Sequence, residues 1–222
     1  MAWNKTVTDS TGTYELIPAG SHIGTLAAVF DVGTHIDNYK GQTTKREILI
    51  AVYLLAKRTP GGRNYVIGEK YNYTYFGLSK WRSVVSAFLG RRLRDGESID
   101  PRNLLGQQAL LVIEHTQSGE NTYHRVESVA PLPEGVPAPP WAKTYDHQIV
   151  AWGVADDHPF PVEHESWLPL IYGETIKSIA ERSLEMSGTT NRPGPASTDA
   201  TPTAAQAKAT EVFNEFAAKV PF

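Results

Sequence analysis

The chain has 222 residues, of which 41% are hydrophobic and 20% charged, with a formal net charge of −3. This length and composition suit one sizeable globular core, or one domain with appendages. The sequence excludes a disulfide, a zinc–thiolate site and a cysteine nucleophile because it contains no cysteine. No apolar run reaches the roughly 18–20 residues of a membrane span, and the N-terminal sequence lacks the apolar segment of a secretory signal. We therefore expect a cytoplasmic protein that does not bind membranes.

Charge is distributed unevenly along the chain. Residues 1–131 carry 15 Lys and Arg against 12 Asp and Glu, whereas residues 132–222 carry 6 against 12. Residues 40–94 alone contain twelve Lys and Arg, two Glu and no Asp, and several tyrosines lie among them. Basic residues interleaved with aromatic ones are typical of a surface that holds phosphates and stacks bases. The alternative is a solvated basic face over an aromatic core.

Alternating apolar residues predict three strands, at residues 21–36, 45–56 and 65–76. The second strand is apolar on both faces, which predicts a central strand covered on both sides. On the third strand Tyr71, Tyr73 and Tyr75 share one face, because side chains alternate with period two. Three tyrosines on one face are unusual for a core, because each buried hydroxyl would need a hydrogen-bond partner. The face is therefore either a platform on which bases stack or part of the core.

The next residues predict a helix that is capped by Ser79 and runs to about Leu93. Its apolar stripe includes Trp81, which we interpret as a core anchor. Two more strands are predicted at residues 107–115 and 122–129. The order of three strands, one helix and two strands predicts a mainly β fold: a five-stranded OB-fold barrel with one inserted helix. We assign this barrel to residues 1–134.

The rear of the chain is predicted to be an extension with a helix, followed by a flexible tail. Residues 135–187 form the extension, with a possible strand at 149–152 and a helix at 172–186. Residues 188–209 are rich in Ser, Thr, Pro, Gly and Ala, which predicts a flexible linker. Residues 210–222 form a short amphipathic interaction tail.

Four short motifs carry a resemblance to a known family: Pro18-Ala19-Gly20, Gly41-Gln42-Thr43, Leu104-Leu105-Gly106-Gln107 and Val129-Ala130-Pro131-Leu132-Pro133. Over roughly residues 16–133 the chain resembles phage-encoded single-stranded DNA-binding proteins with an OB-fold. The resemblance implies sequence-independent binding of single-stranded DNA in replication or recombination.

The terminal residues Val220-Pro221-Phe222 are similar to the C-terminal tip of bacterial single-stranded DNA-binding proteins, which docks on replication and repair proteins. A terminal aromatic can fill an apolar pocket while the α-carboxylate meets a basic group. Lys219 departs from that family, which has an acidic run at this place. An ordinary docking helix is the alternative. The predicted partner-binding residues are Phe213, Phe216, Val220, Pro221 and Phe222.

The sequence offers no pattern that predicts an enzyme. Walker A, Rossmann, His-Glu-x-x-His and Gly-x-Ser-x-Gly motifs are absent. Residues 156–158 and 163–165 contain Asp, Glu and His, but the intervening prolines break the ligand spacing of a helical metal site. We expect no cofactor and no metal.

The sequence therefore predicts a non-enzymatic protein that binds single-stranded DNA. Basic side chains would contact phosphates and tyrosines would stack on bases without reading sequence. The predicted phosphate contacts are Lys45, Arg46, Lys57, Arg58, Arg63 and Lys70, and the predicted stacking residues are Tyr53, Tyr71 and Tyr73. A protein-interaction module, such as a phage inhibitor or a virion component, and an RNA-binding protein are the alternatives. The edge strands of a small barrel can pair with those of a second copy, so a homo-oligomer is a further possibility.

Overall fold

The computed structural model describes residues 16–39, 42–118, 121–136, 149–157, 159–184 and 186. All of them belong to one compact unit that spans residues 1–190. The predicted linker and tail, at residues 188–209 and 210–222, lie outside the described residues, so their roles stay predictions. No helix in the described part of the chain combines the length and the apolar character needed to span a membrane.

Strands dominate the described residues, and five of them form a continuous antiparallel path in the order β3-β2-β1-β4-β5. A sixth strand, β6, pairs in parallel with β1. The bounds are β1 Gly20–Tyr39, β2 Gln42–Arg58, β3 Asn64–Asn72, β4 Gln108–Ser118, β5 Asn121–Pro131 and β6 Val150–Gly153. The two α-helices are α1 Lys80–Leu89 and α2 Ile176–Glu181, and short 3-10 turns lie at Pro101–Leu104 and Val162–His164. The predicted mainly β fold, with a helix between the third and fourth strands, is confirmed.

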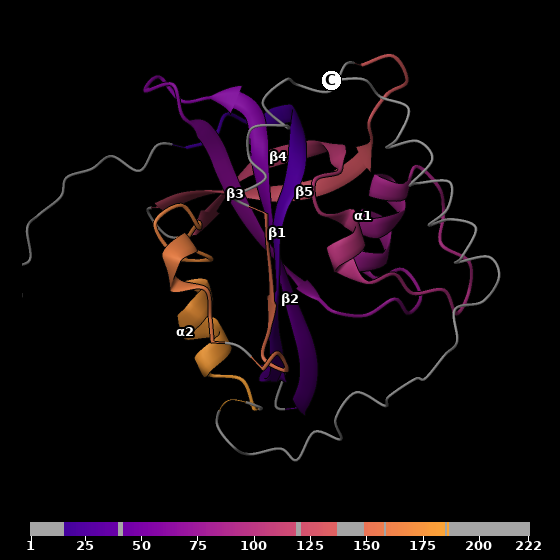
Figure 1. Ribbon diagram of the computed structural model, residues 1–222, viewed down its shortest axis with the longest axis vertical. Helices are drawn as coiled ribbons and strands as arrows, with labels where there is room; N and C mark the ends of the chain where they lie inside the picture. The colour runs from indigo at the N-terminus through magenta and orange to yellow at the C-terminus, as the bar shows by residue number, and fades with distance from the viewer. Residues whose placement is uncertain are drawn as a thin grey trace, which may run out of the picture. The chain divides into compact units, whose positions relative to one another are not determined.

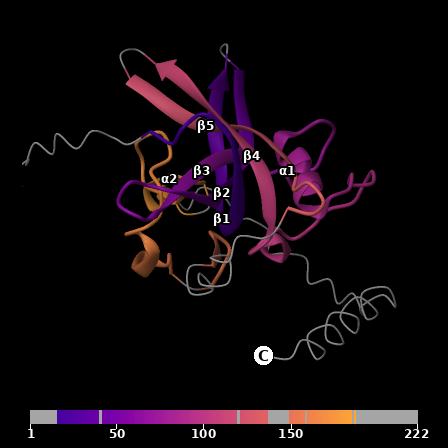
Figure 2. The same cartoon turned by 90° about the horizontal axis from the view of Figure 1, so that it is seen from above.

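Helices α1 and α2 lie on opposite sides of the strands (Figures 1 and 2). One hydrophobic cluster includes Tyr53, Trp81 and Phe88, and so joins β2 to α1. A second cluster includes Ile50 of β2 and Ile179 of α2. Residues 48–55 of β2 are therefore buried on both faces, as the two apolar faces of this strand predicted.

Helix α1 begins and ends at residues with clear capping geometry. The Ser79 hydroxyl accepts a hydrogen bond from the Arg82 N–H at 3.2 Å, which confirms the predicted cap. Trp81 is fully buried, as expected of a core anchor. The helix ends at Leu89 rather than near Leu93, because Gly90 adopts a left-handed conformation with φ 65°.

Two other predicted elements are too long, for local reasons. Strand β3 ends at Asn72 rather than at residue 76, because Thr74 forms local hydrogen bonds: its N–H donates to the Asn72 carbonyl, and its hydroxyl oxygen accepts from the Phe76 N–H. Helix α2 starts only at Ile176, after the cap Thr175. The preceding residues, Ile171 and Glu174, form an isolated β-bridge instead of a helical turn.

The two ends of the five-strand path meet through a buried carboxylate. Glu69 on β3 accepts a hydrogen bond from the Val126 N–H on β5 at 3.1 Å. Lys80 of α1 donates to the Val126 carbonyl at 2.6 Å and lies 3.4 Å from the second Glu69 oxygen. Strand β3 and helix α1, which are neighbours in sequence, thus both contact Val126 on the distant strand β5.

Candidate nucleic-acid interface

Tyr53 and Tyr71 belong to the core and not to a surface platform. Their exposed fractions are 0% and 2%, and their hydroxyl oxygens lie 3.0 Å apart in a mutual hydrogen bond. The Tyr53 ring stacks on Phe88, and the Tyr71 ring packs against Trp81. Burial raises the pKa of both hydroxyls. The predicted stacking role is wrong for these two residues, because neither ring has a face that a base could reach.

Tyr73 lies just beyond the end of β3 and is half-buried. Its ring meets the edge of Tyr75, and both pack against the same core cluster. Burial raises the pKa of the Tyr73 hydroxyl. Only part of this ring is accessible, so a stacking role for Tyr73 stays a prediction.

Residues 159–184, which we call the rear segment, cover the other face of β2 and β3. On β3, a Cβ added to Gly68 would lie 2.3 Å from Ile171 Cδ1 and 2.9 Å from Pro169 Cγ. Only a glycine permits so close an approach. The broad face of these strands is consequently occupied by protein and not free for a ligand.

The six predicted phosphate contacts are all exposed but do not form one patch. Lys45 and Arg46 lie near the start of β2, where they pair with Ile36 and His35 of β1. Lys57 and Arg58 end the same strand, and Arg63 follows in the next turn. At about 3.3 Å per residue, about 40 Å of strand lies between the two groups on β2.

Arg46 and Lys70, in contrast, meet in a cavity of about 450 Å³. We call it the hairpin pocket, because the β1–β2 hairpin supplies one wall and the segment around α2 supplies the other. Its charged and aromatic lining residues are His35, Asp37, Arg46, Lys70, Tyr172, Glu174 and Arg182. Arg46 and Lys70 were predicted from the sequence. Tyr172 and Arg182, which line the same pocket, were not.

The hairpin pocket carries more positive than negative groups. Arg46 Nη1 lies 3.3 Å from Asp37 Oδ2, and Arg182 forms a two-pronged ion pair with Glu174. That pair holds the pKa of Glu174 below its ordinary value, because hydrogen bonds and charge favour the carboxylate. Lys70 forms no ion pair with another described residue, and its ammonium lies 6.0 Å from the centroid of the Tyr172 ring. Arg46, Lys70 and Arg182 thus carry three positive charges against the two negative charges of Asp37 and Glu174, which leaves one positive charge in excess.

Tyr172 presents an aromatic ring at the mouth of this pocket. Its side chain is 67% exposed, and its backbone has φ 52°, the left-handed conformation that is uncommon for an aromatic residue. Hydrogen bonds between Ile171 and Glu174, at 2.8 and 3.1 Å, close the turn that holds it. Such strained backbone is concentrated at functional sites. The turn could have been predicted from the Tyr172-Gly173 pair before the cap Thr175, but its position beside Lys70 could not.

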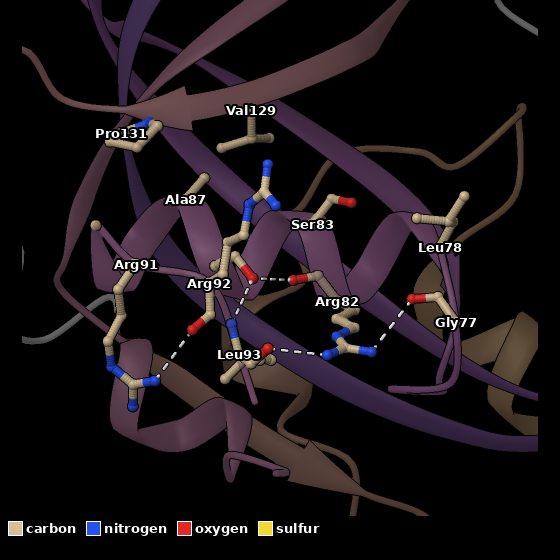
Figure 3. Close-up of a pocket in the computed structure, with 12 residues that line it drawn as sticks. Gly77, Leu78, Arg82, Ser83, Ala87, Arg91, Arg92, Leu93, Val129 and Pro131 are labelled. Atoms are coloured by element: carbon tan, nitrogen blue, oxygen red, sulfur yellow. Dashed lines mark hydrogen bonds between the residues drawn. The ribbon is translucent and has the colours of Figure 1, made fainter. Parts of the chain in front are cut away.

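A second cavity, of about 760 Å³, lies between α1 and β5, and we call it the α1–β5 groove (Figure 3). Three arginines line it. Arg82 donates to the Leu93 carbonyl at 2.8 Å and to Asp95 at 3.0 Å, and Arg91 forms a two-pronged ion pair with Glu97. The Arg92 side chain extends along α1 toward Val129 (Figure 3), and its guanidinium has no ion pair within the described ranges.

Among the described residues, which leave out His158, no group of three or more His, Asp or Glu could hold a metal ion. Asp156, one of the acidic residues considered from the sequence, accepts a hydrogen bond from Gly153 N at 2.7 Å. Its other oxygen lies 3.3 Å from Arg102. This carboxylate therefore has a role in holding the end of β6.

Comparison with known proteins adds no family to this description. A scan against protein-family models finds no match, and a search of curated proteins finds none.

Proposed function

We propose that this protein binds single-stranded DNA without reading its sequence, on a barrel of the OB type. The strand order β3-β2-β1-β4-β5, the contact of β3 with β5 and the helix between β3 and β4 support the OB assignment. Binding would take place in the cytoplasm, in replication or recombination.

The observation that carries the proposal is an exposed aromatic ring among cations in the hairpin pocket. Tyr172 offers a π-face on which any base can stack, a contact worth about 1–3 kcal/mol. Lys70 and Arg46 lie beside it and can neutralise phosphates. Neither kind of contact distinguishes one base from another, which accounts for binding without sequence preference.

The hairpin pocket takes the place of the strand platform that the sequence predicted. In an OB-fold the face of strands 2 and 3 commonly binds the oligonucleotide. Here residues 169–171 cover Gly68 on that face, and the tyrosines of β2 and β3 point into the core. The covering segment itself supplies Tyr172 and Arg182, so an aromatic and a cation are retained at the surface.

Three single variants test the site by fluorescence anisotropy with labelled oligo-dT. Tyr172→Ala and Lys70→Ala should each weaken binding about 5- to 30-fold, since each loses a contact of order 1–2 kcal/mol. Lys177→Ala is the matched control, because it removes one positive charge from α2 outside the pocket. Equal affinities of all three variants would contradict the assignment of the site. Oligo-U in parallel distinguishes a preference for RNA.

Recruitment of replication or recombination proteins through residues 210–222 remains part of this proposal. The supporting observation is in the sequence, in the terminal Val220-Pro221-Phe222. Deletion of residues 211–222 should leave oligo-dT affinity within about twofold while abolishing capture of such a partner. A deletion that removed DNA binding would show that the tail contributes to the nucleic-acid site instead.

A further inference from the structure

The α1–β5 groove combines an apolar floor with an exposed apolar rim. Ala87, Leu93 and Val129 contribute to its lining. The loop that precedes α1 places Leu78 at the groove and Phe76 at a neighbouring cavity of about 500 Å³. These two side chains are 102% and 89% exposed. Contiguous exposed apolar groups rimmed by polar residues mark interaction sites.

One positive group in the groove is available to a ligand. Arg82 is committed to the carbonyls of Gly77 and Leu93 and to Asp95, and Arg91 is committed to Glu97. Arg92 alone among the three reaches across the groove without an ionic partner in the described ranges (Figure 3). A guanidinium binds a carboxylate through two parallel hydrogen bonds, which gives such a contact orientation as well as energy.

The charges around the groove disfavour a long polyanion. The Asp95 and Glu97 carboxylates already pair with Arg82 and Arg91, so among the described arginines of the groove only Arg92 is left for an anion, and a run of phosphates would find one cation. Leu78 also lacks the π-face that a base requires. A ligand with separate carboxylates and apolar side chains avoids both problems.

We propose that the α1–β5 groove docks an acidic peptide segment of a partner protein. A carboxylate of the peptide binds Arg92, and its apolar side chains pack against Leu78, Phe76 and Val129. We infer an acidic peptide because its carboxylate complements the charge of this guanidinium, and because its apolar side chains match the apolar floor of the groove. The inference is independent of DNA binding, because residues at α2 line the hairpin pocket, and α2 and α1 lie on opposite sides of the strands (Figure 1).

The probe is a short fluorescein-labelled peptide that contains Asp, Glu, Leu and Phe. Two matched peptides replace its acids by Asn and Gln, or its Leu and Phe by Ser. The full chain should bind the first peptide about tenfold more tightly than either matched peptide. Arg92→Ala and Leu78→Ser should each weaken that binding about five- to tenfold, whereas Lys177→Ala should leave it unchanged. Both altered side chains are exposed, so circular dichroism should show an unchanged fold.

Several results would overturn the proposal. Equal weakening by Arg92→Ala and Lys177→Ala would reduce the effect to general electrostatic attraction. Equal binding of all three peptides would show that the groove recognises neither the acids nor the apolar side chains. Displacement of the peptide by oligo-dT from a Lys70→Ala protein would make the groove a nucleic-acid surface. A dimer that Leu78→Ser dissociates would identify a second copy as the occupant, and tighter binding of a peptide of residues 211–222 would identify the chain's own tail.

Discussion

The carboxylate of Glu69 on β3 accepts a hydrogen bond from the main-chain N–H of Val126 on β5, 57 residues further along the chain. Only 7% of the Glu69 side chain is exposed. Burial raises the pKa of this carboxyl, and the nearby Lys80 charge and the Val126 hydrogen bond oppose that rise. The contact brings together the two strands at the ends of the five-strand path, so it closes the fold at one point.

Removing the Glu69 side chain should lower the free energy of unfolding substantially. Glu69→Ala leaves the Val126 N–H without its acceptor and Lys80 without its carboxylate, which we expect to cost about 2–4 kcal/mol. Glu69→Gln keeps an acceptor oxygen and avoids the cost of burying a charge, so it should cost about 1 kcal/mol or less. Urea unfolding measures both. Equal costs for the two variants would show that the hydrogen bond to β5 is unimportant.

The Tyr53–Tyr71 hydroxyl pair should behave as one coupled unit. Tyr53→Phe or Tyr71→Phe leaves one buried hydroxyl without its partner and should cost about 1–2 kcal/mol. The double Phe variant should cost less than the sum of the two single variants, because no hydroxyl is then stranded. Tyr123→Phe, at an exposed position on β5, is the control and should change stability by less than about 0.5 kcal/mol. Additive costs in a double-mutant cycle would contradict the pairing.

Gly68 should be intolerant of any side chain. Gly68→Ala places a Cβ 2.3 Å from Ile171 Cδ1, so residues 169–171 must move; we expect a cost of about 1–3 kcal/mol. Because the same segment carries Tyr172, oligo-dT affinity should fall as well. Gly61→Ala is the matched control, since its nearest neighbour would lie at 3.7 Å. A Gly68→Ala protein with native stability and native affinity would show that the rear segment does not need to lie on β3.

His124 should make stability depend on pH. Its Nδ1 accepts a hydrogen bond from the Ile17 N–H at 3.3 Å, while the Nε2–H of His115 donates to the Ile17 carbonyl at 2.7 Å. Burial, and to a lesser extent the charge of His115, lowers the pKa of His124. Protonation of Nδ1 would remove the acceptor that Ile17 uses.

The direction of this effect follows from the lowered pKa. Above about pH 6.5, the ordinary value for histidine, both folded and unfolded forms are neutral and the contribution is fully present. As the pH falls below that value the unfolded chain takes up the proton first, so the free energy of unfolding decreases until the pH passes the folded pKa. Urea unfolding between pH 8 and pH 5 should therefore show a smaller decrease for His124→Gln than for the unaltered protein. Identical slopes would contradict the role given to His124.

Much of the fold was predictable because local pattern and tertiary packing agree. The two apolar faces of β2 indicated burial on both sides, and the Ser79 cap and the stripe containing Trp81 indicated α1. Element ends were less predictable. The end of β3 depends on hydrogen bonds of Thr74 that compete with the strand ladder, and such competition does not alter the hydrophobic pattern.

The candidate site was predictable only in part. Arg46 and Lys70 were identified from charge, and the structure places both in the hairpin pocket. Tyr53 and Tyr71 were misassigned, because period-two alternation shows which residues share a face but not which face is buried. Tyr172 lies about 100 residues beyond Lys70 in sequence, and its position depends on how the rear segment packs on β3.

Sequence-independent binding of single-stranded DNA is the function that we propose for this protein. Its most direct test is a fluorescence anisotropy titration of the unaltered protein with labelled oligo-dT and with a matched duplex, each at two salt concentrations. We predict preferential binding of the single strand, with an affinity that falls as salt rises because phosphate contacts release counterions. Absence of binding to either DNA at low salt, or a preference for the duplex, would contradict the account.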